Sequence, residues 1–77
     1  MIKIVVVYWD DAQAYRGPTD YDDVTEGALK VISAGILISE DETAVRFCQD
    51  SWPRRTARQI QVIPRQYITA MQIIEAE

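Results

Sequence analysis

The sequence predicts a mainly β fold, a small antiparallel barrel of five strands, and three observations support this prediction. Short apolar runs rich in β-branched residues alternate along the chain with charged or proline-containing turns. The stretch 60–74 reads as a strand, a turn that begins at Pro64, and a closing strand. Only residues 65–67 separate Pro64 from the closing strand, which is enough for one 3₁₀ turn and too short for an α-helix.

Length and composition limit the chain to one small domain, residues 1–77. Hydrophobic residues make up 48% of it, which suits a globular core and argues against disorder. With one cysteine, Cys48, and no histidine, we expect neither an internal disulfide nor a zinc site of the usual kind. The chain shows no signal-peptide pattern and no apolar stretch of membrane-spanning length, so we expect a cytoplasmic protein that makes no membrane contact.

The first half of the chain is predicted to form two strands separated by a long acidic excursion. Residues 2–9 are nearly continuous in β-branched residues, which suits a strand buried on both faces or placed at a barrel seam. Residues 19–28 fit either a short helix of one or two turns or a long irregular loop. Residues 30–39 form the second strand, in which Gly35 suggests a bend.

The second half is predicted to form three further strands. A charged hairpin turn at 40–42 leads into a third strand at 43–49, in which Val45 and Phe47 point inward. A connecting loop at 50–56 precedes the fourth strand at 57–63, and the fifth strand covers 69–74. We expect three positions to contribute strongly to the core: Ile36, Phe47 and Val62.

Five short antiparallel strands, a long first connection and a 3₁₀ turn before the last strand are typical of an SH3-like barrel. Three stretches, 8–11, 32–42 and 63–68, resemble sequences of small phage-associated and mobile-element proteins of uncharacterised function. In that group a valine-rich strand ends in Trp-Asp, a Ser-small-Gly strand precedes an acidic hairpin, and an Ile-Pro-basic corner closes the barrel. The resemblance implies this fold and genomic context, and it implies no activity.

Charge is distributed unevenly along the chain, whose net charge is −4. The stretch between Tyr8 and Leu29 has a balance of −5, from Asp10, Asp11, Asp20, Asp22, Asp23 and Glu26 against Arg16. The stretch from Arg46 to Arg65 has a balance of +4, from Arg46, Arg54, Arg55, Arg58 and Arg65 against Asp50. Two solvated loops explain this pattern as well as electrostatic matching between copies or with a partner does.

The sequence offers little for catalysis, and we predict no catalytic residue, no metal site and no cofactor. Without histidine, a general base near neutral pH would have to be a perturbed carboxylate, the cysteine or a lysine. The adjacent acids at 10–11 and 22–23 do not converge on one substrate, because neighbours in a strand point to opposite faces. A lone thiol such as Cys48 is most often a small packing residue.

Aromatic residues give a first candidate binding site. Tyr15 and Tyr21 lie in the first long connection, and Tyr67 lies in the turn before the last strand. SH3 domains use aromatic residues at such positions to line a groove for proline-rich peptides. The structural alternative is that Trp9 and Tyr67 close the ends of the barrel.

The arginine-rich segment gives a second candidate site, formed by Trp52, Arg54, Arg55 and Arg58. Guanidinium groups suit phosphate and an indole ring suits base stacking, so this segment is the best candidate for binding nucleic acid or nucleotides. The sequence pI near 4.6 disfavours binding to a polyanion, and a small anion, an acidic protein or a second copy fits equally well. The sequence therefore predicts a non-enzymatic binding or assembly module that self-associates or binds another protein, with nucleic-acid binding as the alternative.

Overall fold

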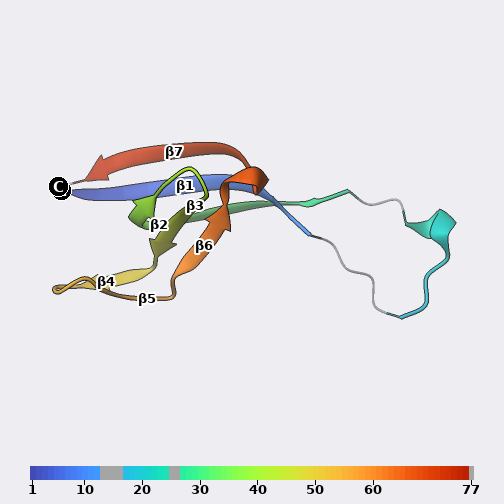
Figure 1. Cartoon of the computed structure of the whole chain (residues 1–77), viewed down its shortest axis with the longest axis horizontal. Helices are drawn as coiled ribbons and strands as arrows, with labels where there is room; N and C mark the ends of the chain where they lie inside the picture. Colours follow the sequence, from blue (N-terminus) through green and yellow to red (C-terminus); the bar gives the residue numbers. More distant parts are fainter. Residues whose placement is uncertain (13–16, 25–26, 77) are drawn as a thin grey trace.

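The computed structural model describes residues 1–12, 17–24 and 27–76, and the structural statements below concern these residues. Five strands form an antiparallel sheet in the order β6-β3-β2-β1-β7, and two further strands form a separate hairpin, β4–β5 (Figure 1). The strands are β1 (Ile2–Asp11), β2 (Leu29–Glu40), β3 (Ala44–Cys48), β4 (Asp50–Trp52), β5 (Thr56–Arg58), β6 (Gln61–Pro64) and β7 (Ile68–Ala76). The mainly β prediction is confirmed.

Strand β1 lies between β2 and β7 in the sheet and pairs with both over most of its length. Val5 lies opposite Gly35 on one side and opposite Ile73 on the other. Directly paired residues of antiparallel strands share a face, so this register decides which side chains reach the core. Register shifts at Tyr8/Trp9 and between Leu37 and Ser39 bend the sheet around that core.

The hydrophobic core lies on the inner face of the bent sheet. Its fully buried side chains come from β1, β3 and β6, and are Val5, Val7, Val45, Phe47 and Ile63. Gly35 lets β3 approach closely, because a Cβ atom there would lie 2.6 Å from the carbonyl oxygen of Cys48 and 2.8 Å from the Phe47 ring. The bend predicted at Gly35 thus has a steric cause.

The core prediction is confirmed for Phe47 and wrong for Val62. The side chain of Val62 is 55% exposed, while its neighbour Ile63 is buried. Ile36 is only half-buried, because it shares the outer face of the sheet with its partner Ile4. In β2 the partners of Val5 and Val7 are the small residues Gly35 and Ser33, and Leu37 also packs against the core.

The sheet is not closed into a barrel, which corrects the closed form expected from the sequence. Strands β6 and β7 occupy opposite edges, where β6 pairs only with β3 and β7 only with β1 among the described residues. A 3₁₀ turn, η2 (Arg65–Tyr67), connects these two edges as predicted, and Pro64 is the last residue of β6. The turn joins the two edge strands at one end, and no backbone pairing forms between their described residues.

The predicted fourth strand is interrupted, and the loop expected before it contains a hairpin. Residues 57–63 do not form one strand, because Gln59 has a left-handed backbone with φ of 56° that separates β5 from β6. Residues 50–58 fold back on themselves as β4–β5, with Trp52 opposite Thr56. Pro53 favours a turn between the two strands and was therefore a sequence signal for this hairpin.

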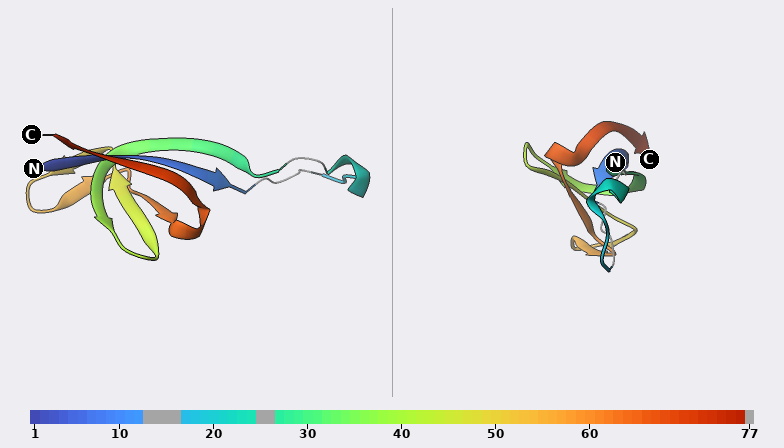
Figure 2. Two further views of the ribbon diagram at one scale, coloured as in Figure 1. Left: turned by 90° about the horizontal axis from the view of Figure 1, so that it is seen from above. Right: turned by 90° about the vertical axis from the view of Figure 1, so that its right-hand side faces the viewer.

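The described residues of the first connection, 17–24, lie away from the sheet and form the tip of what we call the arm (Figure 2). This tip holds a 3₁₀ helix of three residues, η1 (Tyr21–Asp23), which is at the short end of the one or two helical turns expected as one alternative. The molecule measures 51 × 22 × 19 Å, and its radius of gyration of 15.9 Å exceeds the roughly 11.5 Å expected for a compact chain of this length. Within the described residues, no helix is long and apolar enough to cross a membrane.

Candidate functional site

The β4–β5 hairpin carries four of the predicted site residues. Arg58 on β5 donates hydrogen bonds from Nε and Nη2 to Oδ2 of Asp50, at 3.1 and 2.8 Å. Its guanidinium carbon also lies 5.2 Å from the centre of the Trp52 ring. Arg58 is therefore bound within the hairpin by both Asp50 and Trp52, and its guanidinium group covers one face of the indole ring.

Arg54 and Arg55 form the turn of this hairpin, and both have left-handed backbones, with φ of 71° and 63°. This conformation is unfavourable for side chains other than glycine, asparagine and aspartate, so the turn places two arginines where the backbone favours other residues. Such strain is often found at functional positions.

The structure divides the five arginines of the basic segment into two groups. Three of them form ion pairs inside the chain: Arg46 with Asp41, Arg58 with Asp50, and Arg65 with Glu40. Neither Arg54 nor Arg55 forms an ion pair with another described residue. The positive charge available to a ligand or partner is therefore concentrated at the tip of the β4–β5 hairpin.

The acidic segment divides in the same way. Asp10 forms an ion pair of 3.6 Å with Lys30 at the base of the arm. At the arm tip, Asp20, Asp22 and Asp23 are exposed and form no ion pair with a described residue. Figure 1 shows η1 at one end of the long axis and the β4–β5 hairpin toward the other. The molecule is therefore an elongated body with an acidic end and a basic end.

The aromatic candidates do not form one groove. Tyr15 lies outside the described residues. Tyr21 is 95% exposed in η1 at the arm tip, whereas Tyr67 lies in η2 beside the sheet (Figure 1). Trp9 packs against the core, and its indole N–H donates to the hydroxyl of Ser33 at 3.0 Å. Tyr21 and Tyr67 are thus too far apart to line the peptide groove that the SH3 analogy suggested.

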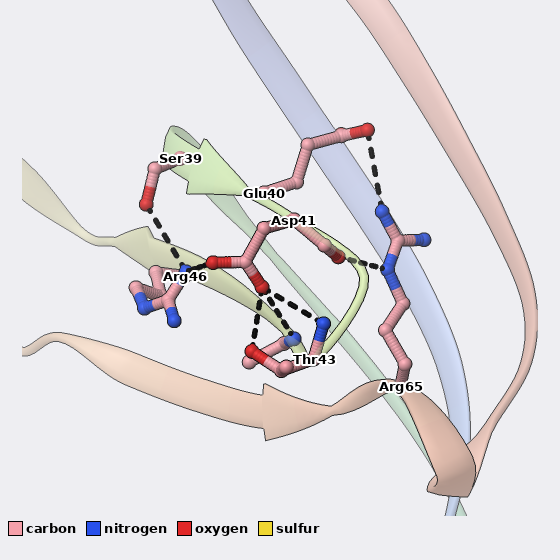
Figure 3. Close-up of polar contacts among 7 residues, drawn as sticks. Ser39, Glu40, Asp41, Thr43, Arg46 and Arg65 are labelled. Carbon is pink, nitrogen blue, oxygen red and sulfur yellow. Dashed lines mark hydrogen bonds and ion pairs between the residues drawn. The ribbon is translucent and has the colours of Figure 1, made fainter.

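The turn between β2 and β3, with η2 beside it, forms a closed polar network that we call the corner (Figure 3). Oδ1 of Asp41 accepts hydrogen bonds from the Thr43 hydroxyl and from the backbone N–H groups of Thr43 and Ala44, at 2.6, 2.9 and 3.0 Å. Oδ2 accepts from Arg46 at 3.1 Å, and the Asp41 carbonyl accepts from Arg65 at 2.8 Å. The pKa of Asp41 lies well below its usual range, because these hydrogen bonds stabilise the ionised carboxylate. The Thr43 hydroxyl contributes most, followed by the two backbone N–H groups and then by Arg46.

An apolar surface on the outer side of the sheet was missed from the sequence. The register places nine residues of three neighbouring strands on this outer face: Ile4, Val6, Tyr8, Ile32, Ala34, Ile36, Ala70, Gln72 and Ile74. Ile32 is 68% exposed, Ile74 46% and Tyr8 40%. The signal was the isoleucine-rich face of residues 32–38, of which Ile36 was predicted to contribute to the core.

A cavity of about 360 Å³ lies beside the outer face, between β2 and the β4–β5 hairpin. Its lining is mainly apolar with two polar side chains, and consists of Ile36, Leu37, Ile38, Cys48, Ser51, Arg55, Ala57 and Ile60. Arg55 thus connects the basic tip to an apolar hollow. Cys48 is fully buried, as a packing residue would be.

No group of three or more potential metal ligands occurs within the part of the chain that the structure describes. Comparison with known proteins finds no matching family model, no matching curated protein and no matching solved structure. The function therefore has to be inferred from the residues and the geometry of this chain.

Proposed function

We propose that this chain is a non-enzymatic assembly module that self-associates through the outer face of its sheet. The observation that carries the proposal is the exposure of large apolar side chains on three adjacent strands, Ile32 on β2, Tyr8 on β1 and Ile74 on β7, of which Ile32 is the most exposed. An exposed apolar face on neighbouring strands is a type of surface that mediates contacts between proteins. Strand β7 adds an open edge beside this face and carries no charged side chain before Glu75.

The proposal includes the fold type and the context. The strand order and the 3₁₀ turn before β7 support an opened variant of the SH3-like barrel. A cytoplasmic location is proposed separately, and the free, buried Cys48 suits a reducing compartment. We propose the relationship to small proteins of phages and mobile elements on the basis of the three sequence patterns at 8–11, 32–42 and 63–68. Neighbouring genes that encode capsid, replication or anti-defence proteins would support this relationship.

Sedimentation velocity over a range of concentrations tests the self-association. We expect the parent chain to shift from a small to a larger species as its concentration rises, and Ile32→Lys to remain small. Val62→Lys is the matched control, because Val62 is also an exposed strand residue but lies on the edge strand β6, outside the three strands that carry this apolar surface. A parent chain that stays monomeric at high concentration in low salt, or a Val62→Lys variant that dissociates equally, contradicts the proposal.

A second candidate function is binding of nucleic acid or nucleotides at the tip of the β4–β5 hairpin. The favouring observation is that Arg54 and Arg55 form no ion pair with a described residue and stand close to Trp52 in the chain. The covered face of the Trp52 ring and the net charge of −4 argue against it. Retention on a single-stranded oligonucleotide column that is lost in Arg54→Glu with Arg55→Glu would favour this function.

A further inference from the structure

The outer face alone is too small to hold a stable dimer. Strands lie about 4.8 Å apart and rise about 3.4 Å per residue, so three strands over five residues each give a footprint on the order of 250 Å². Stable interfaces bury roughly 800 Å² of accessible surface on each partner. A self-associating copy must therefore use further surface, and the arm and the β4–β5 hairpin are the elements that project beyond the sheet (Figure 2).

We propose that two copies pack outer face against outer face with antiparallel long axes, so that the arm tip of each lies on the other's β4–β5 hairpin. This inference rests on the proposed self-association and adds its partner, orientation and second contact. Sheets that pack face to face keep their strands aligned within about 30°, which leaves parallel or antiparallel long axes as the choices. The antiparallel choice gives a closed dimer with a two-fold axis.

Charge selects between these two orientations. The unpaired acids Asp20, Asp22 and Asp23 lie at one end of the molecule, and Arg54 and Arg55 lie toward the other. Parallel copies would bring acid against acid and arginine against arginine. Antiparallel copies bring the acidic tip against the basic tip twice, so both contacts are attractive.

The cavity beside Arg55 gives the arm tip a specific seat. Its volume of about 360 Å³ and apolar walls suit an aromatic ring, and Arg55 on its lining suits a carboxylate that arrives with the ring. Tyr21 is 95% exposed and stands directly between Asp20 and Asp22 in the chain. An exposed tyrosine that fills a partner's pocket is a frequent anchor of protein interfaces. Tyr21 of the second copy is therefore the occupant assigned to this cavity.

Charge reversal tests the orientation by mixing two variants. One variant, Arg54→Glu with Arg55→Glu, has two acidic ends, and the other, Asp20→Arg with Asp22→Arg, has two basic ends. Each alone places like charges at both contacts, and we expect its dimer Kd in low salt to rise about tenfold or more. In an equimolar mixture the basic arm meets the acidic hairpin and the acidic arm meets the basic hairpin, so a mixed dimer forms with near-parental Kd. Glu42→Arg is the control, because it changes an exposed charge on the β2–β3 turn and should leave Kd unchanged.

Substitution of Tyr21 tests the cavity contact separately. We expect Tyr21→Ala to raise the dimer Kd about tenfold or more and Tyr21→Phe, which keeps the ring, to raise it less. Circular dichroism should be unchanged, since Tyr21 makes no contact with the core.

The possible failures are distinguishable. If Ile32→Lys dissociates the parent species but neither charge variant weakens it and their mixture forms no preferred pair, the orientation is wrong while self-association through the outer face stands. If the parent forms chains of increasing size instead of a dimer, a head-to-tail arrangement replaces the two-fold one. A monomeric parent overturns both the orientation and the proposed function.

Discussion

The corner and the β4–β5 hairpin are both turns with arginines beside them, and the two regions use these arginines in opposite ways. At the corner, Arg46 and Arg65 each meet a carboxylate of the same chain, and Asp41 gathers four hydrogen bonds on its side chain. At the hairpin tip, Arg54 and Arg55 have strained backbones and no ion pair with a described residue. The difference teaches that charge in this chain has a structural role where it is matched within the chain and is available for binding where it is not.

This comparison predicts that stability resides in the corner and in the core that β3 shares with it, and that the hairpin tip contributes little. The following substitutions test it from the largest expected effect to the smallest.

Phe47→Ala should have the largest effect on stability. Phe47 is fully buried among Val5, Val7 and Ile63, so its removal leaves a cavity at the centre of the core. We expect a loss of about 3–5 kcal/mol, a large part of the stability of a domain of this size. Chemical denaturation measures it, and Val62→Ala is the control that should cost less than about 0.5 kcal/mol because that side chain is 55% exposed. Equal losses in the two variants would show that the core faces are misassigned.

Gly35→Ala should come next. A Cβ atom at this position would meet the backbone oxygen of Cys48 at 2.6 Å, and backbone yields less readily than a flexible side chain. We expect a cost of about 1–3 kcal/mol from overpacking where β2 and β3 approach each other. Ala34→Gly, which removes a methyl group from an exposed neighbour in the same strand, gives the comparison for backbone effects alone. An unchanged Tm in Gly35→Ala would mean that the strands are more widely spaced than described.

Asp41→Asn should reduce stability in a way that depends on pH. The pKa of Asp41 is lower in the folded chain than in the unfolded chain, so the ionised carboxylate stabilises the fold above the unfolded pKa of about 3.9. This contribution is lost as pH falls through the folded pKa. The Tm difference between the parent and Asp41→Asn should therefore be full at pH 7 and shrink below about pH 4.

Glu42→Gln is the matched control for the corner, because it removes an equal charge from the next residue and Glu42 takes part in none of the corner's hydrogen bonds. Its Tm should stay close to that of the parent at both pH values. A Tm difference for Asp41→Asn that persists unchanged to pH 2 would show that the amide, and not the lost charge, is responsible.

The backbone turns of the corner were largely predictable from sequence, and the hairpin and the outer face were not. Pro64 removes a backbone donor and fixes φ, so the end of β6 and the turn η2 followed from local chemistry. Period-2 alternation in β2 offered two apolar faces, and choosing between them requires the packing of β3 on Gly35, which depends on contacts distant in sequence. The left-handed backbone of Gln59, which divides the predicted fourth strand, has no signal in a glutamine side chain.

The same limit applies to the candidate site. The unequal charge of the two segments was visible in the sequence, but which arginines are paired was not, because Asp50, Asp41 and Glu40 reach their partners through strand register. The sequence analysis therefore treated all arginines of the cluster as equally available for binding. The structure reduces its available part to Arg54 and Arg55.

Arg54→Gly should have the smallest effect and is the most direct test of the hairpin side of the comparison. At φ of 71° a glycine relieves the steric conflict of the left-handed backbone, while it adds conformational entropy to the unfolded chain. These two terms are each about 1 kcal/mol and oppose each other, so we expect stability to change by less than about 1 kcal/mol in either direction. Arg65→Gly is the contrast, because it also removes the hydrogen bond to the Asp41 carbonyl and the ion pair with Glu40, and it should lower Tm clearly. If Arg54→Gly lowers Tm as much as Arg65→Gly does, Arg54 has a structural role at the hairpin tip, and its charge is not available for binding a partner.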